Sequence, residues 1–137
     1  MKTMRWCVVM VMAAALSAAG CGGGAGGPLT QLEGVKAGAL QVVLLADHES
    51  LRHGKDAFVI EFRSESGALV DVGAVKAGAS MPMPGMPMFS TIDVQRTGVP
   101  GRYAATGEFS MAGRWRFAVE WDGPQGRGQV SFSGSVQ

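Results

Sequence analysis

Apolar side chains beyond residue 38 recur in short runs of period two, and this pattern limits the chain to β-structure. The clearest run is 114–121, RWRFAVEW, in which apolar residues occupy every second position and alternate with mostly charged ones. Successive side chains of a strand point to opposite faces, so each such run buries one face and exposes the other. No stretch keeps the 3.6-residue period of a helix, and we therefore predict an all-β domain.

Gly, Pro, Asp and Ser signals separate these runs at short intervals. The predicted strands are 39–46, 57–63, 68–75, 88–95, 102–109, 114–121 and 127–136. About seven short strands in roughly a hundred residues match an immunoglobulin-like antiparallel β-sandwich. A partly open barrel is the alternative, because the number of strands does not separate the two architectures.

The first 20 residues have the order of a secretory signal peptide. Lys2 and Arg5 precede an apolar run over 6–16, and small residues fill 17–20. The run is shorter than the ~20 apolar residues that a membrane-spanning helix needs. We therefore predict a signal peptide over 1–20 that is removed on export.

The segment 16–21, LSAAGC, resembles the lipobox of bacterial lipoproteins. That resemblance implies cleavage before Cys21, lipidation of Cys21 and anchoring to a membrane of the cell envelope. Because Gly22 and not aspartate follows the cysteine, it also implies the outer membrane, facing the periplasm, in a Gram-negative cell. The alternative is a secreted protein without lipid.

Residues 21–37 are rich in glycine and are predicted to be a flexible tether with a reach of roughly 20–24 Å. The folded domain is predicted over 38–137. Cys7 would leave with the signal peptide and Cys21 would carry lipid, so no disulfide could form within one mature chain. Removing Lys2 and Arg5 changes the formal net charge from +1 to −1, and with no basic stripe in the sequence we expect no nucleic-acid partner.

Four of the five methionines that follow Cys21 fall in the segment 80–88, SMPMPGMPM. Thioether sulfur is neutral and polarisable and prefers Cu(I) or Ag(I) to hard ions such as Mg²⁺ or Ca²⁺. The prolines would stiffen the loop, and Gly85 would let the chain reverse. The candidate metal ligands, with Cu(I) as the expected ion, are Met81, Met83, Met86 and Met88, with Met111 from a neighbouring turn.

Packing is an equally good interpretation of the same segment. Methionine is an adaptable packing residue, so the loop would then cap one end of the domain or dock on a partner. His48 and His53 lie in the predicted loop 47–55, where imidazole would widen the metal range to Cu(II) or Zn²⁺. For both histidines a solvated loop is the favoured interpretation, and they stay outside the predicted ligand set.

The pattern of Met81, Met83, Met86 and Met88, followed by 101–103 (GRY) and 111–115 (MAGRW), resembles the YtkA-like domain, which is related to the FixH group. The resemblance covers roughly residues 38–136. It implies a small β-sandwich in the bacterial envelope that takes part in copper or other cation handling, with an efflux or oxidase-assembly protein as partner. It places the family's methionine motif on the four loop methionines and on Met111.

Two functions follow from these observations. The first is a lipid-anchored envelope domain that binds Cu(I) or Ag(I) through the methionine loop. The second is an interaction module whose Pro-Met loop docks on an envelope membrane complex without metal. We predict no enzymatic activity, because the one mature cysteine would be acylated and neither histidine has a nucleophile and an acid in a recognisable arrangement.

Overall fold

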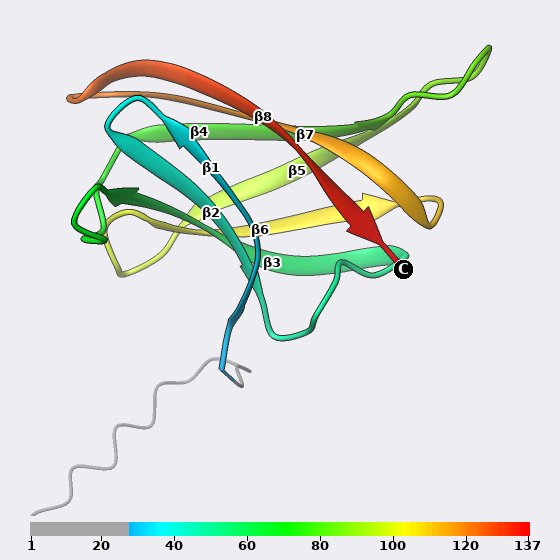
Figure 1. Cartoon of the computed structure of the whole chain (residues 1–137), viewed down its shortest axis with the longest axis horizontal. Helices are drawn as coiled ribbons and strands as arrows, with labels where there is room; N and C mark the ends of the chain where they lie inside the picture. The colour runs from blue at the N-terminus through cyan, green and yellow to red at the C-terminus, as the bar shows by residue number, and fades with distance from the viewer. Residues whose placement is uncertain (1–27) are drawn as a thin grey trace, which may run out of the picture.

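The computed structural model describes residues 28–137, which form eight strands joined by short connections (Figure 1). The strands are β1 (Thr30–Ala37), β2 (Leu40–Ala46), β3 (Gly54–Ser64), β4 (Ala74–Met81), β5 (Met88–Arg96), β6 (Arg102–Phe109), β7 (Gly113–Gly123) and β8 (Gly126–Val136). The predicted all-β class is confirmed.

All eight strands belong to one sheet with the order β1-β2-β3-β6-β5-β4-β7-β8, and every neighbouring pair is antiparallel. The sheet curls until its two edge strands, β1 and β8, contact each other. Figure 1 shows the result as two layers, with β4, β7 and β8 above β3 and β6. Because the strands form one continuous, nearly closed sheet, their connectivity is that of the partly open barrel given above as the alternative.

Aromatic side chains from the two layers meet in the core. Phe58 and Phe62 of β3 pack edge-to-face on Phe117 and Trp121 of β7, at ring-centroid distances of 6.5 and 5.3 Å. Because β3 and β7 are not neighbours in the sheet, these contacts join its two halves across the interior. They bury the apolar face that the alternation in β7 predicted.

The predicted tether is wrong over its second half, because residues 30–37 form strand β1. Leu32, Val35 and Ala37 are half-buried against the core, and β1 pairs with β2 over its whole length. The alternation was hard to see because Gly34 lies within the strand and a register irregularity separates Gln31 from Glu33.

The predicted strand at 68–75 is also misplaced. Most of this segment is a loop that holds a single bridge between Leu69 and Arg63, and β4 begins only at Ala74. The Asp71 carboxylate accepts a hydrogen bond from the Gly73 amide, and Gly73 has a φ of 88°. This local turn prevents an extended strand before Ala74.

Within residues 28–137, no helix has the length and apolar character needed to cross a bilayer. The predicted signal peptide, Cys21 and the first part of the tether lie outside the described residues.

Candidate metal centre

The methionine segment forms the tip of the hairpin between β4 and β5, which projects beyond the sheet at the upper right of Figure 1. Met81 ends β4 and lies directly opposite Met88, which begins β5. The ladder stops at this pair, and every second residue beyond it toward the tip is a proline, which has no N–H to donate. Gly85, with a φ of 83°, allows the reversal at the tip.

Methionine and proline alternate on both arms of this hairpin. Met83 and Met86 lie two residues beyond the Met81–Met88 pair, one on each arm of the turn at 84–85. Their exposure differs greatly: Met81 is 7% exposed, Met88 is half-buried, and Met83 and Met86 are 40% and 78% exposed. The hairpin therefore carries two sulfurs against the core and two in solvent.

The turn between β6 and β7, residues 110–112, lies against the base of the hairpin. The Ser110 hydroxyl donates to the Met88 sulfur at 3.9 Å. A Cβ atom on Gly113 would come within 2.8 Å of the Met81 methyl group, so the end of the Met81 side chain lies directly against the start of β7. The structure therefore brings Met81 and Met88 to the turn that contains Met111.

Met111 itself is 42% exposed, and its carbonyl oxygen accepts a hydrogen bond of 2.9 Å from Nε1 of the fully buried Trp115. This bond fixes the backbone of the turn to the core and leaves the thioether outside. Met83 and Met86 lie farther out on the hairpin, beyond the pair that the ladder holds. Of the five predicted ligands, Met81 and Met88 thus form a base held by the sheet, while Met83 and Met86 at the tip and Met111 on the neighbouring turn are exposed.

The two histidines have different environments, and only His53 agrees with the predicted solvated loop. His53 is exposed, and its Nε2 lies 3.1 Å from the Ser110 carbonyl oxygen, at the same turn that touches Met88. His48 has a side chain that is only 8% exposed, and its Nε2 lies 3.0 Å from the Asp56 carboxylate. Sequence reasoning missed His53 because the distance of 57 positions between it and Ser110 hides their contact.

The donor set at this end fits a soft monovalent ion. Residues 77–92 contain no charged side chain, so the hairpin offers neutral sulfur and no carboxylate. Elsewhere in residues 28–137, no three His, Cys, Asp or Glu side chains group as a metal site. Neutral thioethers match Cu(I) or Ag(I), whereas Mg²⁺ or Ca²⁺ would require oxygen ligands.

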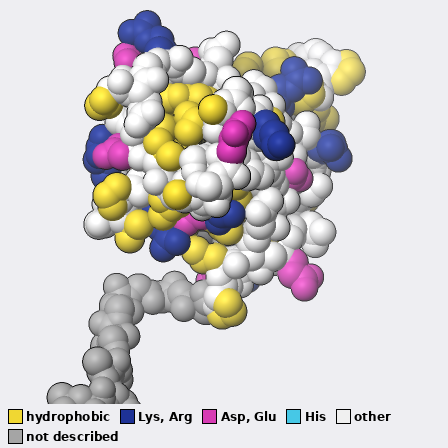
Figure 2. All heavy atoms as spheres, turned by 60° about the vertical axis from the view of Figure 1, so that its left-hand side comes forward, with side chains coloured by type: hydrophobic (Ala, Val, Ile, Leu, Met, Phe, Trp, Pro, Cys, Tyr) yellow, Lys and Arg dark blue, Asp and Glu magenta, His cyan; other side chains and the backbone are white. Residues whose placement is uncertain are grey.

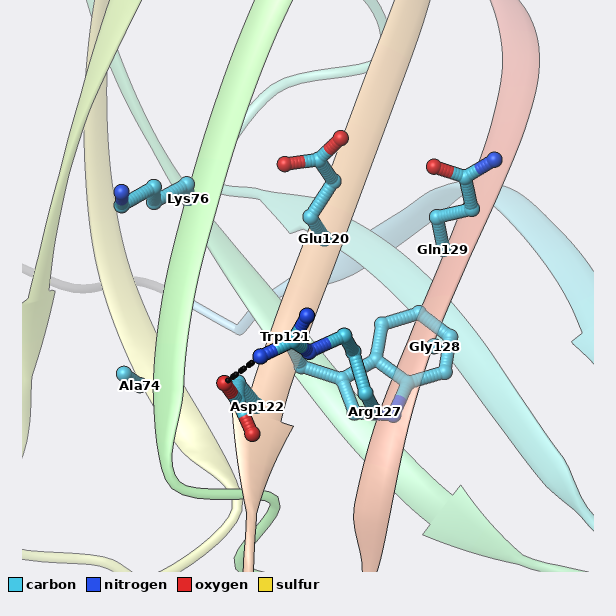
Figure 3. A pocket seen from close by; sticks show the side chains of 8 residues that line it. All are labelled: Ala74, Lys76, Glu120, Trp121, Asp122, Arg127, Gly128 and Gln129. Carbon is cyan, nitrogen blue, oxygen red and sulfur yellow. Dashed lines mark hydrogen bonds and ion pairs between the residues drawn. The ribbon is translucent and has the colours of Figure 1, made fainter.

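A pocket lies away from the hairpin, on the outward side of β4, β7 and β8 (Figure 3). It has a volume of about 730 Å³, and it is lined by Lys76, Glu120 and Gln129 and by an ion pair of 2.9 Å between Asp122 and Arg127. The two members of that pair are largely exposed, so water screens them. This open groove of mixed charge has no donor set comparable to the methionine hairpin.

Figure 2 shows the molecule turned so that the left-hand side of Figure 1 faces the reader. Lysine, arginine and acidic side chains are interspersed on this face around a central group of hydrophobic atoms. The visible charges form no single-sign stripe.

Fold and site together define a small, curled all-β domain with a methionine-lined hairpin. The fold is similar to that in a crystal structure of FetP from uropathogenic Escherichia coli, with a TM-score of 0.50 and 12% identity over 80% of this chain and 97% of that one. A structure of a copper-bound FetP variant matches with a TM-score of 0.49 and 9% identity over 79% and 97% of the two chains. No curated protein matches the sequence.

The profile of the YtkA-like family matches residues 35–120, and the chain belongs to that family. The match includes the whole methionine hairpin and the turn that carries Met111. The family predicted from the sequence motifs is therefore confirmed.

Proposed function

We propose that the protein is a lipid-anchored domain of the cell envelope that binds Cu(I) or Ag(I) through its methionine hairpin. The observation that carries this proposal is the pairing of Met81 with Met88 at the end of a ladder, where methionine and proline begin to alternate. This arrangement gathers four thioethers within eight residues at one end of the sheet, next to the turn that holds Met111.

Binding of a soft ion would need little reorganisation at the base of the hairpin. Met81 and Met88 are held by the sheet, and the prolines restrict the backbone that carries Met83 and Met86. Part of the conformational freedom of the loop is therefore already absent before the ion binds. Because all these ligands are neutral, the site favours a monovalent ion over a divalent one.

The hairpin is displayed at a distance from the point where the chain enters the domain. In Figure 1, β1 begins at the lower left and the hairpin tip lies at the upper right. With Cys21 lipidated at the outer membrane, the tip would be free to face a partner in the periplasm. We propose that this partner is an efflux or oxidase-assembly protein, and that the domain transfers or sequesters the ion without an enzymatic reaction.

The test is NMR of the full chain in a mild detergent, with ¹³C-labelled methionine methyl groups and added Ag(I). We expect the methyl resonances of Met81, Met83, Met86 and Met88 to shift together until one equivalent is bound. The same titration of a variant in which these four methionines are leucine serves as the control and should show no bound equivalent. Absence of any shift at the four hairpin methionines would contradict the proposal.

A Cys21→Ser variant tests the anchor separately. We expect the wild-type protein to fractionate with membranes and the variant to be released, because the thiol that would carry lipid is missing. Equal membrane association of both proteins would contradict lipid anchoring and would leave the metal proposal unaffected.

One observation favours the alternative of a docking module. Phe89, directly after the methionine segment, is 77% exposed, close to the 78% of Met86. Its phenyl ring has no sulfur with which to bind the ion, so metal binding does not explain this exposure. In this case an envelope complex would co-purify with the wild-type protein whether or not copper is chelated. Replacing Met83 and Met86 by serine would release it, and retention of the complex by that variant would contradict docking through the hairpin.

A further inference from the structure

His53 is fixed at the base of the methionine hairpin by three segments of the chain. It directly precedes β3, and its amide donates a hydrogen bond of 2.7 Å to the Gln137 carbonyl oxygen. The next residue, Gly54, pairs with Phe109 at the end of β6. The backbone that carries the imidazole is therefore held in place, although the His53 side chain is exposed.

The contact between His53 and Ser110 determines which ring nitrogen is free. Nε2 lies 3.1 Å from the Ser110 carbonyl oxygen, and a carbonyl oxygen only accepts hydrogen bonds. Nε2 must then carry the proton, which leaves the lone pair of the neutral ring on Nδ1. Histidines that ligate metals usually donate their other ring N–H to a carbonyl or carboxylate in this way.

Ser110 connects this imidazole with a thioether. Its carbonyl oxygen accepts from His53, and its hydroxyl donates to the Met88 sulfur at 3.9 Å. Met111 is the next residue along the chain. A nitrogen with a free lone pair and two predicted sulfur ligands are thus attached to one short turn.

His48 lacks these properties. Its Nε2 contacts Asp56, whose carboxylate also accepts from the amides of Arg52 and Ala57. Its Nδ1 is buried and has no hydrogen-bond partner among residues 28–137. His48 therefore belongs to the packing of its loop, and an ion arriving from solvent would meet His53.

We propose that His53 is a nitrogen ligand of the methionine site, that it coordinates through Nδ1, and that it gives the site an affinity for Cu(II). This inference rests on the proposed function. Thioethers alone select Cu(I) and Ag(I), whereas imidazole also binds Cu(II) well. With both donor types the site keeps copper when the ion is oxidised.

The first experiment compares Cu(II) and Ag(I) binding by the full chain, its His53→Ala variant and an Arg52→Ala control. Arg52 is an exposed neighbour whose side chain makes no hydrogen bond within residues 28–137. We expect His53→Ala to bind Cu(II) at least about tenfold more weakly. Ag(I) binding should weaken less than Cu(II) binding, because the thioethers supply most ligands of the softer ion, and the control should behave as wild type. Equal Cu(II) affinity of His53→Ala and wild type, or no Cu(II) binding by wild type, would overturn the proposal.

The second experiment follows the His53 ring by ¹⁵N NMR, with diamagnetic Ag(I) as the probe. We expect Nε2 to carry the proton before and after addition, and only the Nδ1 resonance to shift. A shift of Nε2, or no shift of either nitrogen while the methionine methyl groups move, would overturn coordination through Nδ1. If the methyl groups do not move either, the metal function itself fails, so the two failures are distinguishable.

Discussion

Glu61 lies on the outward side of β3, yet its carboxylate is almost completely buried between two arginines. Arg63 and Arg102 both donate hydrogen bonds to it, the latter from Nε at 2.7 Å. Burial raises the pKa of Glu61, but the hydrogen bonds and charges of the two arginines outweigh burial and lower the pKa below its ordinary value. This network joins β3 to β6 at the end of the sheet away from the hairpin.

We predict that Glu61→Gln destabilises the protein by roughly 1–3 kcal/mol at pH 7, because it removes a charged acceptor from a buried network. The arginines are partly exposed, so the loss falls short of that for a fully buried ion pair. Since the folded-state pKa is lowered, the stabilisation is complete above the unfolded-state pKa, near 4.5, and is lost as the pH falls through the folded-state pKa.

Denaturant unfolding of both proteins between pH 7 and pH 3 measures this effect. The difference in free energy of unfolding should be largest at pH 7 and should shrink in acid. A difference that stays constant with pH would show that the charge of Glu61 does not contribute.

At the scale of elements, strong alternation predicted strands well and weak alternation did not. The prediction for 102–109 matches β6, and that for 114–121 falls within β7, because each run buries aromatic residues on one face. β1 was missed because Gly34 and a register irregularity interrupt a short alternation. The segment 68–75 was misplaced because the turn at Gly73 depends on a side-chain hydrogen bond from a neighbouring position.

For the candidate site, too, the sequence predicted the local features and missed those that depend on the fold. The sequence was sufficient to predict that the four methionines lie together in one loop, since their spacing is local. It did not separate buried Met81 from exposed Met86, because that difference comes from the sheet around them. The position of His53 depends on a contact with Ser110 across β3 and β6, and periodicity contains no information about such a contact.

We predict that replacing Pro82, Pro84 and Pro87 by alanine weakens Cu(I) binding without loss of folded stability. Each proline restricts the free loop by about 0.4–1 kcal/mol, so the triple variant should bind about tenfold or more weakly. The three residues are exposed and outside the ladder, so the midpoint of thermal unfolding should barely change. Unchanged Cu(I) affinity would show that the prolines do not preorganise the site.

At the scale of the whole molecule, β1 determines where the domain begins. The strand covers one edge of β2 and contacts β8, which nearly closes the sheet. A domain boundary at residue 38, as the glycine-rich composition suggested, would remove this strand. The family match begins at residue 35, inside β1, and agrees with a domain that extends before Gly38.

We predict that a chain starting at Gly38 is less stable than one starting at Pro28 by roughly 3–5 kcal/mol. The shorter chain loses the partial burial of Leu32, Val35 and Ala37 and one complete ladder. Chemical denaturation of the two chains measures the difference in free energy of unfolding. The full chain serves as a control and should match the chain that starts at Pro28. Equal stability of both would mean that β1 is an accessory strand.

The central claim is that the hairpin methionines bind Cu(I), and an anaerobic Cu(I) titration against a competing chromophoric ligand tests it most directly. The comparison is with a variant in which Met81, Met83, Met86 and Met88 are leucine, which keeps side-chain volume and therefore the fold. We predict one tightly bound equivalent in the wild-type protein and none in the variant. Stoichiometric Cu(I) binding by the folded variant, or its absence from the wild-type protein, would contradict the claim.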